Sequence, residues 1–157
     1  MTSMAGNLRS ALVYLAENEP GIVAAMHFNS PGIYYEQDEP FVLKTWREGA
    51  TLAALLCGSL VRFSFREANL RDSKKTDWRS YQASRCRSVR EFENLCLLIQ
   101  IRALNEAELF YEAYSQPAGE KDITLHVTLN RYSPDEEINR QLVKLLDVCR
   151  GWSAGSI

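Results

Sequence analysis

A run near the C-terminal end of the chain alternates strictly between apolar and polar side chains. From Ile123 to Asn130 the sequence reads ITLHVTLN, with apolar residues at every odd number and polar residues at every even number. A β-strand places successive side chains on opposite faces, so this period of two is typical of a half-buried strand. We expect its apolar side to meet a core and its polar side to meet solvent, a groove or a partner.

The segment after this strand carries signals for both ends of a helix. Ser133 can act as N-cap, Pro134 suits the first helical position, and Glu136 completes a capping box. Gly151 is suited to the position just after the last turn, and the tail 152–157 is expected to fray. Apolar residues recur at helical spacing and form one stripe: Ile138, Leu142, Leu145, Leu146 and Cys149.

The same periodicities and the turn residues predict the remaining elements. In chain order, we expect a helix over 8–17, a hairpin of strands 22–29 and 33–36, a strand over 41–44, a helix over 46–57 ending at Gly58, strands over 59–66 and 109–114, and turns at 105–106 and 117–119. The run 89–104 fits a continuous helix or a helical turn over 89–94 followed by a strand over 97–101, and we favour the second.

These elements predict a single α+β domain covering 1–157. The expected architecture is an antiparallel sheet of about five or six strands, with the N- and C-terminal helices packed on one face and a long basic insert over 67–88. A chain of 157 residues with 46% hydrophobic and 24% charged residues is of ordinary composition for a globular protein. No apolar run is long enough for a membrane helix and no signal peptide is recognisable, so a cytoplasmic location is expected.

The four cysteines, Cys57, Cys86, Cys96 and Cys149, lack metal-type spacing. We expect them to be reduced and buried, as is usual in a cytosolic protein. The acidic clusters at 36–39 and 135–137 lack the spacing of a calcium loop, and no glycine-rich phosphate loop is present. Neither a metal nor a cofactor is therefore expected.

Basic residues gather in the middle of the chain. Between Arg62 and Arg90 there are nine basic and three acidic residues, a net charge of +6, so the rest of the chain carries −8 to give the overall −2. A long polar loop in a compact domain is usually functional or disordered. The candidate partner-binding residues are Arg71, Lys74, Lys75, Trp78, Arg79, Tyr81, Arg85 and Arg87.

Three interpretations of this basic insert compete. It can be a solvated loop, a contact surface for an acidic protein, or a nucleic-acid site in which Trp78 and Tyr81 stack on bases. The negative charge of the rest of the chain argues against strong non-specific DNA binding. We favour a small non-enzymatic protein that inhibits or escorts a protein partner. In size, charge and order of elements the chain is similar to bacterial immunity proteins and secretion chaperones. A homodimer through an edge strand at 33–36 stays open.

The two histidines suggest an enzymatic alternative. His126 and Thr128 lie two apart on one predicted strand, and His27 and Asn29 show the same spacing on another. This pattern resembles the two-histidine phosphoesterases, which carry paired His-x-Thr/Ser motifs, although Asn29 replaces the hydroxyl residue. The resemblance implies that one imidazole acts as base and the other as acid on a nucleotide phosphodiester, with the rings roughly 5–8 Å apart across a groove. The competing interpretation is a surface His126 and a partly buried, hydrogen-bonded His27.

Overall fold

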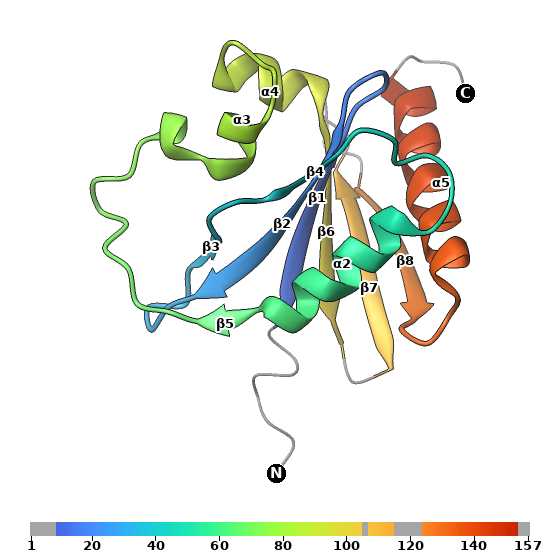
Figure 1. The fold of residues 1–157 in the computed structure, drawn as a ribbon, viewed down its shortest axis with the longest axis horizontal. Coiled ribbons are helices and arrows are strands. Elements are labelled where there is room, and N and C mark those ends of the chain that lie inside the picture. Colours follow the sequence, from blue (N-terminus) through green and yellow to red (C-terminus); the bar gives the residue numbers. More distant parts are fainter. Residues whose placement is uncertain (1–8, 105–106, 115–123, 154–157) are drawn as a thin grey trace.

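The computed structural model describes residues 9–104, 107–114 and 124–153. Its strands form one sheet in the order β3-β2-β1-β6-β7-β8, and β4 and β5 pair with β2 (Figure 1). The strands are β1 (Ser10–Leu15), β2 (Gly21–Phe28), β3 (Tyr34–Glu36), β4 (Phe41–Leu43), β5 (Ser64–Phe65), β6 (Leu97–Ala103), β7 (Glu108–Tyr114) and β8 (Thr124–Asn130). Among the strands of the described residues, the short pairing of β2 with β5 alone is parallel. The expected α+β class with an antiparallel sheet is confirmed.

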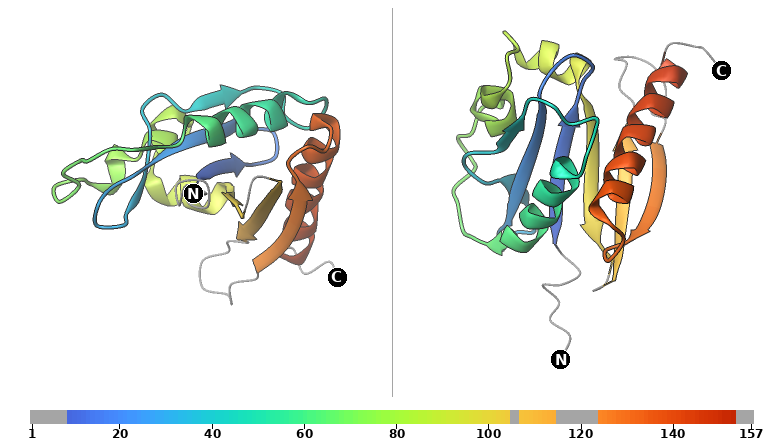
Figure 2. Two further views of the ribbon diagram at one scale, coloured as in Figure 1. Left: turned by 90° about the horizontal axis from the view of Figure 1, so that it is seen from below. Right: turned by 45° about the vertical axis from the view of Figure 1, so that its right-hand side comes forward.

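Helices cover both faces of this sheet. They are α2 (Thr51–Arg62), the 3₁₀ helix η1 (Lys75–Asp77), α3 (Arg79–Ala83), α4 (Val89–Leu95) and α5 (Asp135–Ser153). The long helices α2 and α5 lie on one face, and the short helices α3 and α4 lie on the other (Figure 2). In the part of the chain that the structure describes, no helix is both long and apolar enough to cross a membrane.

The face under α2 and α5 holds the larger core. Val13 of β1 pairs with Val23 of β2 on one side and with Ile99 of β6 on the other, so the three side chains point toward the same helices. Leu56 of α2 and Leu142 of α5 pack onto this layer and are fully buried. Most of its side chains are aliphatic, with Trp46 and Tyr111 as its buried aromatic members, and we call it the aliphatic core.

The prediction of a helix over 8–17 is wrong, because this segment forms β1 in the centre of the sheet. Val13 and Leu15 enter the aliphatic core, whereas Tyr14 faces the opposite side of the sheet and is also buried. A strand that is covered on both faces has no alternation to reveal it. Its continuous apolar run is therefore easily read as a helix.

The helix expected over 46–57 instead begins at Thr51 and ends at Arg62. Gly49 has φ +83°, a left-handed conformation that interrupts any earlier helix, while Gly58 lies inside α2 and does not end it. Because the helix extends further than expected, the predicted strand over 59–66 shrinks to Ser64–Phe65.

Most of the other predicted elements agree with the structure. The hairpin β2–β3, the short strand β4, the order α4 then β6, and the meander β6–β7–β8 followed by α5 are all confirmed. Ser88 caps α4 by accepting a hydrogen bond from the backbone N–H of Glu91 at 3.1 Å. The predicted end of the last helix is wrong, because α5 continues through Gly151 to Ser153, so the first two residues of the tail expected to fray at 152–157 are helical. The turns expected at 105–106 and 117–119 and residues 154–157 lie outside the described residues.

Candidate functional site

The basic insert is anchored to the sheet by one carboxylate. Glu36 lies on β3, and its Oε1 accepts a hydrogen bond from Trp78 Nε1 at 2.8 Å. The same carboxylate accepts bonds from Ser80, from the hydroxyl at 2.7 Å and from the backbone N–H at 3.3 Å. Glu36 therefore fixes the start of α3 to an edge of the sheet.

Aromatic rings surround this anchor and form a second, smaller core. The ring of Trp78 meets Phe92 of α4 edge-on at 4.8 Å between centroids and Tyr14 of β1 at 5.6 Å. Tyr81 also packs against Phe92, at 6.2 Å. We call this group, with Ile22 and Ala24 of β2, the aromatic core. Edge-to-face contacts of this kind stabilise a fold beyond the area that they bury.

These contacts change the role expected of two insert residues. Trp78 and Tyr81 were expected to be exposed anchors for a partner or stacking platforms for bases. Both side chains are half-buried, and their rings pack against the aromatic core. They hold the insert in place, and the free surface that remains for a partner is mostly charged.

Burial around the anchor changes the acidity of its groups. Desolvation raises the pKa of Glu36 above its ordinary value, and the hydrogen bonds from Ser80 and Trp78 oppose part of this rise. Burial also raises the pKa of the Tyr14 hydroxyl, and the nearby Glu36 carboxylate adds to that effect. The carboxylate is thus a structural group that favours its protonated form more than an exposed glutamate does.

The cations of the insert stay on the surface. Arg71, Lys74, Lys75, Arg79, Arg85 and Arg87 are all exposed. Arg79 forms an ion pair with Asp38 at 3.0 Å. Within the described ranges, the other five form no ion pair. The predicted basic surface is therefore present as a set of unpaired charges on an anchored segment.

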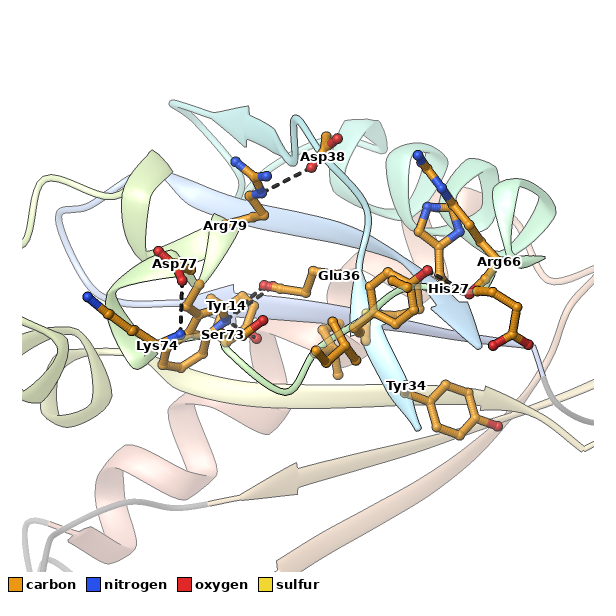
Figure 3. A pocket seen from close by; sticks show the side chains of 17 residues that line it. Tyr14, His27, Tyr34, Glu36, Asp38, Arg66, Ser73, Lys74, Asp77 and Arg79 are labelled. Atoms are coloured by element: carbon orange, nitrogen blue, oxygen red, sulfur yellow. Dashed lines mark hydrogen bonds and ion pairs between the residues drawn. The ribbon is translucent and has the colours of Figure 1, made fainter. Parts of the chain in front are cut away.

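A pocket of about 700 Å³ opens between the loop 66–79 and strands β1 to β3 (Figure 3). Its wall on the sheet includes Leu12, Met26 and Tyr34, and its wall on the loop includes Leu70 and Trp78. Arg66 and His27 lie at one end, Lys74 and Asp77 lie at the other, and Glu36 lies between them (Figure 3). The size is in the usual range for small-molecule sites.

The two histidines do not share a groove. His27 is on β2 and His126 is on β8, where it pairs with Glu112 of β7. Strands β1, β6 and β7 separate them, which corresponds to roughly 15–20 Å across the sheet. The 5–8 Å geometry that a two-histidine phosphodiesterase requires is thus contradicted by the strand order.

The surroundings of His27 and Asn29 agree with the structural interpretation. His27 Nδ1 is hydrogen-bonded to Ser64 Oγ at 2.8 Å, and its ring packs on Tyr35 at 5.1 Å between centroids. Burial and the nearby Arg66 lower its pKa, so the imidazole is neutral at pH 7. Asn29 is buried and accepts the Ile33 N–H at 2.9 Å, which closes the β2–β3 turn. Thr128 is exposed on β8, far from this turn.

Metal ligands and reactive thiols are not brought together in the described segments. Over 9–104, 107–114 and 124–153, no three His, Cys, Asp or Glu side chains are grouped as a metal site requires. Cys57, Cys86 and Cys96 are half-buried and are not joined in disulfides, and burial raises the pKa of the Cys57 and Cys86 thiols. A thiol with a raised pKa is a poor nucleophile at neutral pH.

Three residues of the site were missed from sequence: Tyr14, Glu36 and Ser80. They come from β1, β3 and α3, and no local pattern links them. Glu36 ends the three-residue strand β3, and in sequence it reads as part of the acidic cluster at 36–39, so nothing marks it as the one carboxylate that contacts the insert.

Comparison with known proteins supports the fold alone. No family model matches this chain, and no curated protein matches it. A solved structure of a protein of unknown function from Neisseria meningitidis is similar, with a TM-score of 0.64 and 15% sequence identity. The alignment covers 87% of this chain and 92% of that protein. The architecture described above is therefore shared with another protein, and this similarity bears on the fold and not on the function.

Proposed function

We propose that this chain is a small non-enzymatic binding protein that recognises an acidic surface of a protein partner through its basic insert. Such binding would serve one of two roles. The chain would inhibit its partner, as an immunity protein does, or escort it, as a chaperone does. The observation that carries the proposal is the anchoring of the insert. Hydrogen bonds from Trp78 and Ser80 to Glu36 tie the insert to the sheet, and five of its cations form no ion pair with any residue that the structure describes.

Anchoring matters because ordering a loop on binding costs conformational entropy. A surface that is fixed before the partner arrives avoids part of that cost. The exposed arginines supply planar groups that match carboxylates with two hydrogen bonds each. Charges of this kind also accelerate the encounter with an oppositely charged surface. The described geometry thus supports a contact surface better than a solvated loop.

Nucleic acid is the competing partner for the same cations. Single-stranded nucleic acids are usually held by aromatic side chains that stack on bases. Trp78 and Tyr81 are committed to the aromatic core, which weakens this alternative. The charge of −8 outside the segment 62–90 also opposes a polyanion that extends beyond the insert.

The experiment is affinity purification with the intact chain after nuclease treatment, from cells of the organism that carries it. The wild type is compared with the charge-reversed variant Arg71→Glu/Lys75→Glu. We expect one acidic protein to be retained in stoichiometric amount by the wild type and lost with the variant, because two unpaired cations become anions. The variant must keep the wild-type melting curve, since both side chains are exposed.

The matched control is Arg131→Glu/Lys144→Glu, which reverses two exposed charges outside the insert. The proposal requires this control to retain the partner. Loss of the partner in both double variants would indicate a general charge effect and contradict the proposal. Retention that depends on undigested nucleic acid would favour the competing partner instead.

A further inference from the structure

The pocket beneath the loop 66–79 is separate from the cations at 85 and 87, and its walls define a ligand class. Apolar and aromatic side chains form its long sides, among them Leu12, Met26, Tyr34, Leu70 and Trp78. Such walls suit a flat apolar body. Polar groups follow the length of the pocket: Arg66 and His27 lie at one end, Lys74 and Asp77 at the other, and Glu36, Asp38 and Arg79 lie between them (Figure 3).

The carboxylates of the pocket already have hydrogen-bond donors. Glu36 accepts bonds from Trp78 and Ser80, and Asp38 is ion-paired with Arg79. Asp77 accepts the backbone N–H of Lys74 at 2.9 Å. Glu67 accepts the backbone N–H of Ser30 at 2.8 Å and also its hydroxyl.

Two cations of the pocket lack such partners. Within the described part of the chain, neither the Arg66 guanidinium nor the Lys74 ammonium forms an ion pair or a side-chain hydrogen bond. The groups of the pocket that remain available to a ligand are therefore mainly hydrogen-bond donors. The four carboxylates outnumber the three cations, Arg66, Lys74 and Arg79, which excludes a polyanion such as a nucleoside triphosphate.

We infer that this pocket binds a planar aromatic monocarboxylate, with its ring between the sheet and the loop and its carboxylate on Arg66. Arg66 is preferred over Lys74 because a guanidinium forms two parallel hydrogen bonds with a carboxylate. Lys74 is also close to Asp77, which bonds its backbone. His27 lies beside Arg66 and is neutral at pH 7, so it does not compete for the anion.

This inference goes beyond the proposed partner binding and does not depend on it. The test is calorimetric titration of the intact protein with 2-naphthoate and with its neutral analogue 2-naphthamide. We expect 2-naphthoate to bind with one-to-one stoichiometry and to bind about tenfold more tightly than the amide, the size of one charge-assisted hydrogen-bond pair at a partly exposed site. Equal binding of the two probes, or no binding of either at about 1 mM, would overturn the inference.

Two variants assign the site. Arg66→Met keeps the length of the side chain and removes the charge, so it should weaken 2-naphthoate about tenfold and leave 2-naphthamide unchanged. Arg90→Met is the matched control, because Arg90 is exposed on α4 and does not line the pocket. An unchanged affinity in Arg66→Met, or an equal loss in both variants, contradicts the assignment.

A second measurement reports on the position of the carboxylate. The chain has only two histidines, so their ring protons can be followed separately by NMR. A carboxylate seated on Arg66 lies near His27 and should raise the pKa of that ring on addition of 2-naphthoate, while 2-naphthamide leaves it unchanged. An identical response to both probes would place the acid group elsewhere and refute the inference.

Discussion

The two faces of the sheet are held by different physical means. On one face, α2 and α5 bury a continuous layer of aliphatic side chains. On the other, a smaller group of aromatic rings and the half-buried Glu36 carboxylate hold the basic insert. Aliphatic burial depends on area alone, whereas the second face depends on a few directional contacts.

This difference separates stability from binding. The aliphatic core can lose or gain a methyl group without changing any exposed charge. Tyr14 and Trp78 of the aromatic core also line the pocket, and Trp78 anchors the insert that carries the exposed cations, so a change there alters the candidate surface as well. Regions that are joined by few contacts also open at lower free energy than the rest of a domain. The variants below test this division.

The largest effect is expected in the aliphatic core. Leu56→Ala removes a fully buried side chain of α2 and should lower the free energy of unfolding by about 2–5 kcal/mol. Urea denaturation followed by far-UV circular dichroism measures this loss. Val61→Ala on the same helix is the control: Val61 is 61% exposed, so its loss should stay within about 0.5 kcal/mol. Equal losses in the two variants would contradict the assignment of the core.

A smaller and more local effect is expected for Trp78→Ala. The ring is only partly buried, so we expect a loss of about 2–3 kcal/mol, below the range for a fully buried Trp. Limited trypsin digestion should cut first after the exposed basic residues 71–79, while the sheet stays intact. Trp78→Phe keeps an aromatic ring but lacks the Nε1 donor, so its loss of stability should lie between those of the wild type and Trp78→Ala. An unchanged digestion pattern would show that Trp78 does not anchor the insert.

Glu36→Gln tests the anchor through pH. The pKa of Glu36 is raised in the folded protein, so its stabilising contribution is full below its ordinary value of 4.5 and is lost as pH rises through the folded pKa. The wild type should therefore lose stability relative to Glu36→Gln as pH increases from about 4 toward 8. Denaturant midpoints across this range provide the measurement. A constant difference between the two proteins would mean that the carboxylate is not desolvated.

The smallest effect is expected at the start of α4. Ser88→Ala removes the hydroxyl that accepts the Glu91 N–H and should lower the free energy of unfolding by about 1 kcal/mol. Ser88→Asp keeps a hydrogen-bond acceptor at the same position, so its free energy of unfolding should differ from that of the wild type by no more than about 0.3 kcal/mol. A loss of the same size in Ser88→Asp would show that the cap does not depend on the acceptor. Thermal unfolding resolves the two variants.

The parts that sequence predicted well have one exposed side. Strand β8 and helix α5 each place apolar residues on one side only, so their periods identify them directly. The glycine signal for the end of α5 failed, because the helix continues through Gly151 to Ser153. Strand β1 was missed because both of its faces are buried. Helix α2 begins later than predicted because Gly49 adopts a left-handed conformation just before it.

The candidate site was harder to predict for a different reason. The exposed cations at 71–87 follow from composition, and the structure places all of them on the surface. The contacts that hold these cations in place cannot be predicted from composition, because Tyr14, Glu36 and Trp78 are brought together only by the fold. Conversely, the two histidines have similar local sequence patterns, but they lie on β2 and β8, which three other strands separate in the sheet.

Native-state hydrogen exchange tests the division between the two faces most directly. Amide exchange is followed at increasing denaturant for the backbone N–H groups of α3, which bond within the insert, and for those of β1 and β6 in the sheet. The account predicts that the α3 amides exchange with a lower opening free energy than the β1 and β6 amides. Trp78→Ala should lower the opening free energy of the α3 amides further and change that of the sheet amides less. A single opening free energy for all of these amides would contradict it, since the insert and the sheet would then unfold as one unit.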